Sequence, residues 1–125
     1  MKRILVVEDE EEVAGLLKAR LESNGYEVRL ADRGRDALEA ARADRPDLVV
    51  LDLMLPDMDG YAVSEQLRER YSSRALPILM LTARYQPRDK LLGFGMGADA
   101  FMTKPFNPRE LLSTIAELLA HAEGG

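Results

Sequence analysis

The chain has 125 residues, of which 46% are hydrophobic and 31% are charged, a balance typical of one soluble globular domain. Its net charge of -5 argues against nucleic-acid binding by this segment, and its lack of cysteine excludes disulfides, thiolate metal sites and cysteine nucleophiles. No apolar run approaches the roughly 20 residues that span a bilayer, and Ile4–Val7 runs directly into acidic residues. We therefore expect a cytoplasmic protein without a membrane segment or signal peptide.

Five short apolar runs are predicted to be strands. Four of them do not alternate between apolar and polar residues, so we expect both of their faces to be buried. The run at Glu27–Ala31 alternates at Val28 and Leu30, which suits a position nearer the sheet edge. In chain order the runs are Ile4–Val7, Glu27–Ala31, Leu48–Leu51, Ile78–Leu81 and, more weakly, Ala100–Met102.

Segments of helical length follow the strands, and their apolar residues recur every three or four positions. Such residues are Val13, Leu16, Leu17 and Leu21, then Ala37, Leu38 and Ala41, then Val63 and Leu67, and finally Leu111, Leu112, Ile115, Leu118 and Leu119. A further helix is expected around Lys90–Met96, where Gly93 and Gly95 should weaken its later half. The alternation predicts an α/β fold with a doubly wound, five-stranded parallel sheet. We expect one domain over residues 1–122, with 123–125 as a tail or the start of a linker.

Acidic side chains follow two of the predicted strands: Glu8, Asp9 and Glu10 follow the first, and Asp52 follows the third. In a doubly wound sheet, ligands bind at the edge formed by the carboxyl ends of the strands, where these acids are expected. A divalent cation would offset the repulsion between the carboxylates gathered there. Magnesium suits such oxygen ligands, whereas zinc would require histidine or cysteine. The alternative, acids favoured at the start of a helix, explains Glu10 and its successors but not Asp52, which follows a buried strand.

The fourth strand is expected to end in Thr82 and the fifth in Lys104. Each residue alone is commonplace, because threonine often caps a turn and lysine is usually solvated. Together with the acids, however, they provide a nucleophile, a metal site, a hydrogen-bond donor and a fixed cation. Such a combination indicates a phosphoryl site.

Four motifs, in this order, resemble those of the receiver domains of two-component response regulators, the chemotaxis regulators among them. The motifs are Ile4–Glu10, Asp52–Gly60, Leu81–Arg84, and Gly97–Asp99 with Thr103–Phe106. The resemblance extends from Arg3 to about Leu119 and implies a flavodoxin-like strand order of 2-1-3-4-5.

The resemblance also implies how the site works. Asp52 would accept a phosphoryl group from a histidine kinase, a histidine phosphotransfer protein or a small phosphodonor. Magnesium would be held by Asp9, Asp52 and the backbone carbonyl of Met54, with Glu8 acting through water. The protein would be a signalling phospho-acceptor, not an ordinary enzyme, and would catalyse only its own phosphorylation and dephosphorylation.

A conformational switch is implied as well. Thr82 and Lys104 would hold the phosphoryl oxygens, and Phe101, which has no hydroxyl, would act as an aromatic switch by packing alone. The signal would leave through the helix around Lys90–Met96, the strand bearing Phe101 and the final helix, towards an output domain, another protein or a second copy. The resemblance further implies a cis peptide bond at Lys104–Pro105.

Two other classes of protein remain open. Phosphohydrolases with an aspartate nucleophile also place an acid after a parallel strand, but they normally carry a second aspartate where this chain has Met54. An interaction module that is not phosphorylated could use the same fold, although the intact set of acids, threonine and lysine argues against it.

Several weaker signals are discounted. Residues Asp57–Gly60 do not form a calcium loop, because aligning Gly60 with the invariant glycine places Leu55 and Gln66 at ligand positions. Asp59 is expected to cap the following helix, and Gly97 to end the preceding one. His121 is expected to be solvent-exposed and receives no functional role.

Overall fold

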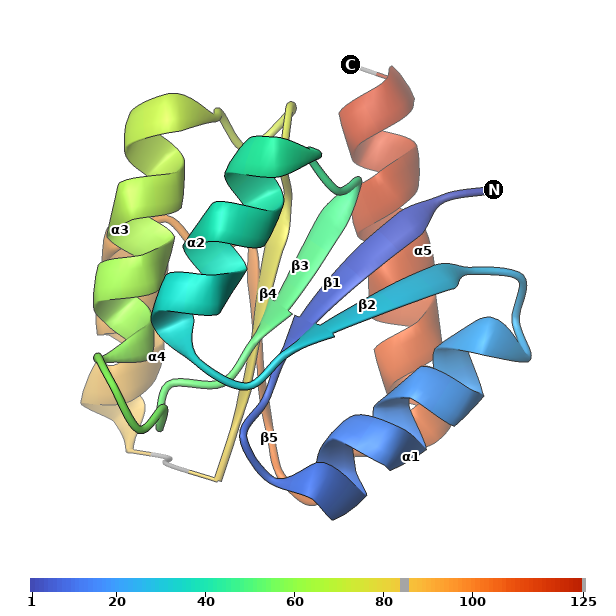
Figure 1. Ribbon diagram of the computed structural model, residues 1–125, viewed down its shortest axis with the longest axis horizontal. Helices are drawn as coiled ribbons and strands as arrows, with labels where there is room; N and C mark the ends of the chain where they lie inside the picture. Colours follow the sequence, from blue (N-terminus) through green and yellow to red (C-terminus); the bar gives the residue numbers. More distant parts are fainter. Residues whose placement is uncertain (84–85, 125) are drawn as a thin grey trace.

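Five parallel strands form one sheet in the order β2-β1-β3-β4-β5 (Figure 1). The computed structural model describes residues 1–83 and 86–124. The strands are β1 (Arg3–Val7), β2 (Glu27–Ala31), β3 (Leu48–Leu51), β4 (Ile78–Thr82) and β5 (Ala100–Thr103). The helices are α1 (Glu11–Glu22), α2 (Gly34–Ala43), α3 (Gly60–Arg70), α4 (Pro87–Gly95) and α5 (Pro108–Gly124). This confirms the expected doubly wound, flavodoxin-like fold.

Helices cover both faces of the sheet, with α2, α3 and α4 on one side and α1 and α5 on the other (Figure 1). Because neighbouring strand residues point to opposite faces, each central strand contributes to two cores. Leu5 and Val7 of β1 pack in the core below α2 and α3, whereas Ile4 and Val6 pack in the core below α1 and α5. The uninterrupted apolar runs in the sequence are therefore the signature of strands covered on both faces.

Two expectations about burial need correction. The predicted strand at Ala100–Met102 was expected to be covered on both faces, but β5 lies at the sheet edge and its residues are only partly buried. Leu16 was assigned to the apolar stripe of the first helix, but 51% of it is exposed. The buried stripe of α1 is formed by Ala14, Leu17 and Leu21, whose spacings of three and four residues leave Leu16 beside it.

Three local expectations are confirmed, two of them helix signals and one a peptide-bond isomer. The carboxylate of Asp59 caps α3 by accepting a hydrogen bond from the backbone N–H of Tyr61 (2.9 Å). Gly97 follows α4 with a φ of +107°, a conformation that favours glycine. The Lys104–Pro105 peptide bond is cis.

At the C-terminus, α5 extends to Gly124. Gly125 of the predicted tail lies outside the described residues, as does Arg84 of the third motif.

A polar stripe on α3, made of Tyr61, Ser64 and Arg68, holds α4. The Tyr61 hydroxyl donates to the backbone carbonyl of Asp89 (3.0 Å) near the start of α4. The Ser64 hydroxyl donates to Met96 O (2.9 Å), and Arg68 Nε donates to Gly97 O (2.8 Å), both just beyond its end. Since the three residues are three and four positions apart, they lie on one face of α3 and contact α4 at both ends.

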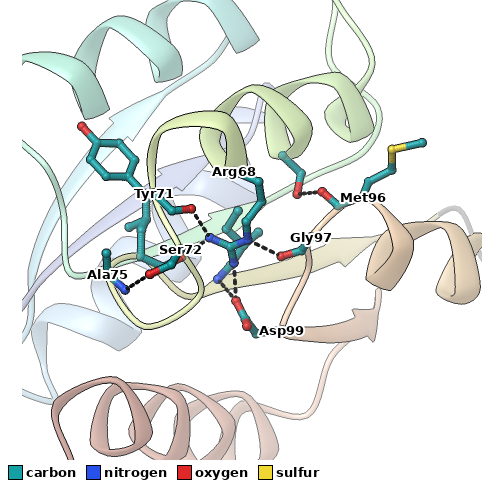
Figure 2. A network of polar contacts seen from close by, with 10 residues as sticks. Arg68, Tyr71, Ser72, Ala75, Met96, Gly97 and Asp99 are labelled. Atoms are coloured by element: carbon teal, nitrogen blue, oxygen red, sulfur yellow. Dashed lines mark hydrogen bonds and ion pairs between the residues drawn. The ribbon is translucent and has the colours of Figure 1, made fainter. Parts of the chain in front are cut away.

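Arg68 also ties the starts of two strands together (Figure 2). Its Nη1 donates to Leu76 O (2.6 Å) just before β4, and its Nη2 pairs with the Asp99 carboxylate (2.5 Å) just before β5. The same carboxylate accepts the backbone N–H of Ile78 (2.8 Å). Burial lowers the pKa of the Arg68 guanidinium, and Asp99 opposes that shift. This anchor lies at the amino-terminal edge of the sheet.

Among the described residues, no helix combines the length and the apolar character needed to cross a membrane.

Candidate functional site

The carboxyl ends of β1 and β3 place two acids next to each other. Val7 pairs with Leu51 in the sheet, so the residues that follow them, Glu8 and Asp52, leave the two strands side by side. The backbone N–H of Asp52 donates to Val7 O (3.0 Å), which continues the sheet bonding by one residue. Both acids are only 4% exposed, an unusual degree of burial for carboxylates that demands a compensating cation.

Lys104 supplies that cation from the end of β5. Its backbone N–H donates to Thr82 O (2.9 Å), which fixes the residue at the sheet edge. Its ammonium nitrogen lies 2.5 Å from Glu8 Oε1 and 3.0 Å from Asp52 Oδ2, and it also forms a longer ion pair with Glu10 (3.6 Å). One ammonium group therefore serves three carboxylates.

The pKa values of the site reflect this crowding. Burial raises the pKa of Glu8, and the charge of Asp52 adds to that increase, although hydrogen bonds from Lys104 and from the backbone of Glu10 oppose it. For Lys104, burial works to lower the pKa, but the bonds to Glu8 and Asp52 outweigh it and the pKa is raised. The ammonium group therefore stays charged beside the three carboxyl groups that it contacts.

The donor set suits a hard divalent cation. Carboxylate oxygens of Glu8, Glu10 and Asp52 lie within 4.8 Å of one another, and one of these residues is exposed, which leaves access from solvent. Carboxylate, carbonyl and water oxygens are the ligands that Mg²⁺ prefers, and no sulfur or imidazole ligand is part of the group. The residues present therefore fit the magnesium ion that the sequence predicted.

The loop after Asp52 is held close to this cluster. The backbone N–H of Met54 donates to Asp52 Oδ1 (3.1 Å), so the loop helps to orient the carboxylate. A Cβ atom on Gly60 would lie 2.4 Å from the carbonyl oxygen of Asp52 and 2.6 Å from Leu53 Cα, so only glycine allows α3 to begin this close to the site. The loop and the start of α3 are thus packed directly against the candidate nucleophile.

The structure brings most of the predicted site residues to this edge. Asp52, Glu8 and Lys104 are in direct contact, and Thr82 is fully buried at the end of β4, opposite Thr103 of β5. Asp9, by contrast, is exposed and is not one of the three acids that come together.

Glu10 takes part in the acidic group, although the sequence indicated only a helix-start acid there. Its place two residues after Glu8, directly beyond the end of the strand at Val7, was the available signal. The backbone N–H of Glu10 donates to Glu8 Oε2 (3.1 Å), which ties the two residues together.

The predicted switch residue Phe101 lies on β5 and packs against the core beneath α2 and α3. Its partner on α4 is Gly93, since a Cβ atom on that glycine would lie 3.0 Å from the Phe101 ring and 2.9 Å from Met80 Sδ. Gly93 therefore allows close packing of α4 on the sheet. Among the described residues, apart from Gly95 itself, its chain neighbours and the backbone of its own helix, no atom lies within 4 Å of a Cβ atom built on Gly95. The two glycines therefore differ in role.

The family model of the response regulator receiver domain matches residues 4–116 of the chain. Over 122 residues the chain is 48% identical to the alkaline phosphatase synthesis transcriptional regulatory protein PhoP of Bacillus subtilis. This match covers 98% of the chain and 50% of PhoP, so the chain spans half the length of that curated relative.

Solved structures agree with this match. A CheY-like response regulator receiver domain protein from Methanospirillum hungatei is 32% identical, with a TM-score of 0.94 and coverage of 99% of this chain and 98% of the other. The BeF3-activated N-terminal receiver domain of Klebsiella pneumoniae RstA is 34% identical, with a TM-score of 0.88, and the match covers 94% of this chain and 97% of the RstA chain.

Proposed function

Because the chain belongs to the family of response regulator receiver domains, we propose that Asp52 accepts a phosphoryl group in a Mg²⁺-dependent reaction and thereby switches an output surface. The observation that carries this proposal is the contact of a buried, strand-end carboxylate with the ammonium group of Lys104 (3.0 Å). A buried aspartate held next to a fixed cation is placed as a nucleophile towards phosphorus, an atom surrounded by negatively charged oxygens.

In the proposed reaction, one carboxylate oxygen of Asp52 attacks phosphorus in line with the bond to the leaving group. The new oxygen–phosphorus bond forms as the bond to the donor breaks, and the donor leaves with its bonding electrons. Lys104 offsets the negative charge of the phosphoryl oxygens, and the Thr82 hydroxyl donates a hydrogen bond to one of them. Met54 N–H orients the attacking carboxylate from the loop.

Magnesium would be held at the acidic group by Asp52, by Glu8 acting through water, by Asp9 and by the Met54 carbonyl, and Glu10 is a further candidate. When bound, the ion offsets negative charge between the carboxylates and the transferring group. Lys104 now neutralises Glu8 and Asp52 directly. With a divalent cation sharing that task, its ammonium group becomes available to the phosphoryl oxygens.

We further propose that the signal leaves through the face formed by α4, β5 and α5. A phosphoryl group at Asp52 would draw the Thr82 hydroxyl towards it, and the space vacated would allow the Phe101 ring to turn. The contact between Phe101 and the Gly93 position would pass this change to α4. The bound partner would be an output domain, a separate protein or a second copy of the chain.

A receiver domain implies a phosphodonor and an output, and we propose a histidine kinase or histidine phosphotransfer protein as the donor. The net charge of -5 disfavours DNA contact by this segment. PhoP is named a transcriptional regulatory protein, and half of its length lies outside the match. By analogy, any DNA contact of this regulator would be made by a separate output region.

The proposal is tested by incubating the protein with acetyl phosphate and Mg²⁺ and measuring the intact mass. The unmodified chain should gain one phosphoryl group, and Asp52→Asn should gain none. Asp47→Asn is a matched control, because Asp47 precedes β3 as Asp52 follows it, so the same chemical change is made at the opposite end of one strand. This variant should be phosphorylated like the unmodified chain.

The same experiment separates the competing classes. Continued turnover of unrelated phosphoesters without a lasting adduct would indicate a phosphohydrolase, and no reaction at all would indicate an interaction module. A full adduct on Asp52→Asn at an unchanged rate would show that another residue is the acceptor.

A further inference from the structure

Helix α2 begins without a cap of its own. Its N-cap residue, Arg33, makes no side-chain bond to the helix, although the first backbone N–H groups of any helix lack intrahelical partners. Asp57, which lies 23 positions after Gly34, the first residue of α2, supplies the missing acceptor. Its Oδ1 accepts the backbone N–H of Gly34 (2.8 Å), and its Oδ2 accepts that of Arg35 (3.0 Å). These two bonds lower the pKa of Asp57.

Close packing reinforces this cap. A Cβ atom on Gly34 would lie 2.4 Å from Met58 Cγ and 2.8 Å from Val63 Cγ2, so the first residue of α2 fits against the residue that follows Asp57. Glycine at this position is what allows the loop to approach the helix. Asp57, through its hydrogen bonds, and Met58, through packing, therefore hold the loop against the start of α2.

The other end of the same loop reaches the proposed metal site. We call residues 53–59 the acceptor loop, because it directly follows Asp52. Met54 forms an isolated bridge with Asp59, and the backbone N–H of Gly60 donates to Leu53 O (2.9 Å), which ties the base of the loop together. The tip, at Asp57, is fixed to α2. The loop that carries the Met54 carbonyl is therefore held at its base and at its tip.

We propose that Asp57 is a positioning residue for the divalent-cation site, because it fixes the acceptor loop on α2 before the cation binds. The inference rests on the proposed function of Asp52 and its metal. A loop ordered in advance spares the binding step the entropy cost of ordering it, and this saving appears as affinity for the cation. Asp57 itself touches neither Asp52 nor Lys104 in the hydrogen bonds that the structure records for it.

The test compares Asp57→Ala and Asp57→Asn with the unmodified chain. Direct titration with Mg²⁺ should show affinity weaker by roughly tenfold in Asp57→Ala, the low end of the effect of removing groups that orient metal ligands. Asp57→Asn keeps one acceptor oxygen and should recover most of the affinity. Without any metal, backbone amides of residues 53–59 and 34–37 should exchange hydrogen faster in Asp57→Ala.

Ser64→Ala serves as the stability control, because it removes a hydrogen bond between α3 and the residue after α4 and leaves the acceptor loop untouched. It should lower the melting temperature without changing the Mg²⁺ affinity. If Asp57→Ala also loses stability but keeps its Mg²⁺ affinity, Asp57 has only a structural role and the inference is overturned. Failure of the unmodified chain to bind Mg²⁺ and form an adduct would instead refute the proposed function, and it would be seen before any variant is made.

Discussion

Lys104 is the residue on which the charge balance of the site depends. Its ammonium group contacts the two buried acids, Glu8 and Asp52, at 2.5 and 3.0 Å. Replacing it with methionine keeps much of the volume and removes the charge. We expect Lys104→Met to form the phosphoryl adduct about 10²- to 10³-fold more slowly, as when one electrostatic donor is removed from a transition state.

Mg²⁺ titration and the time course of intact mass check this expectation. Lys104→Met should still bind Mg²⁺, because the change removes a cation that competes with the metal for the same oxygens. An unchanged rate of adduct formation at saturating Mg²⁺ would rule out a role for Lys104 in the transfer.

The two glycines of α4 were expected to weaken the helix in the same way, but their surroundings differ. A methyl group on Gly93 would press against Met80 and the Phe101 ring, whereas Gly95 faces open space. We predict that Gly93→Ala destabilises the protein by about 1–3 kcal/mol through overpacking. Gly95→Ala should stabilise it by up to about 1 kcal/mol, because alanine is the better helix former.

Urea denaturation of the two variants measures both effects, and each variant is the control for the other. Equal destabilisation by the two substitutions would contradict the packing role of Gly93. The sequence could place both glycines in one helix but not separate them, because the difference depends on β4 and β5 residues that are remote in the chain.

At the scale of the elements, Arg68 is the tie between α3, the loop after α4, and the starts of β4 and β5. Only 15% of its side chain is exposed, and it donates hydrogen bonds to three backbone carbonyls besides its ion pair with Asp99. Removing it takes the Arg68 donors away from these partly buried carbonyl oxygens. We expect Arg68→Ala to cost about 2–4 kcal/mol of unfolding free energy, less than a fully buried ion pair because solvent still reaches it.

Arg70→Ala is the matched control, since this exposed arginine lies two positions away on the same helix. Its effect should remain within about 0.5 kcal/mol, as for most surface substitutions. Equal effects of the two variants on urea denaturation would show that the Arg68 contacts contribute little.

The elements themselves could be predicted because burial on both faces leaves a direct mark on the sequence. The runs at Leu48–Leu51 and Glu27–Ala31 have the bounds that were expected. The strand order implied by the family resemblance placed the fifth strand at the sheet edge, but its apolar run alone did not show its partial burial, since a short apolar run looks the same at an edge as at the centre. Arg68 gave no signal either, because a single arginine near a helix end usually lies in solvent.

At the scale of the whole molecule, metal binding should stabilise the fold. The acids at the sheet edge outnumber the one ammonium group they contact, so a cation that binds only the folded state shifts the unfolding equilibrium. With Mg²⁺ at 100 times its dissociation constant, we expect about 2.7 kcal/mol of added stability. Thermal melting with and without Mg²⁺ measures the shift, and Asp52→Asn should show a smaller one. A midpoint unmoved by saturating Mg²⁺ would contradict the site.

Hydrogen exchange tests the proposed output face. The complex with beryllofluoride and Mg²⁺ stands in for the aspartyl phosphate, and the solved RstA receiver domain is described as BeF3-activated. We expect protection to change most between Thr82 and Phe106. If it changes only around Asp9 and Asp52, the signal does not leave through α4 and β5.

The location of the candidate site could be predicted because the carboxyl ends of parallel strands lie at the same edge of a sheet. This rule, together with the family resemblance, gave Asp52, Glu8, Thr82 and Lys104 their common location. It could not reveal that Lys104 bonds Glu8 as well as Asp52, or that Glu10 joins the acidic group. Side-chain direction after the strand end decides these contacts. Nor could it show the cap that Asp57 makes on α2, because local sequence does not report which distant helix start lacks an acceptor.

The polar stripe on α3 has a consequence for how α4 can move. Tyr61, Ser64 and Arg68 lie at intervals of three and four residues on α3 and donate hydrogen bonds to α4 or to the residues just beyond it. A slide of α4 by one helical turn, about 5.4 Å, would break all three bonds at once. These three bonds therefore act as one constraint on α4. We expect the helix to keep its place on α3 while they hold and to move as a unit once they are broken together.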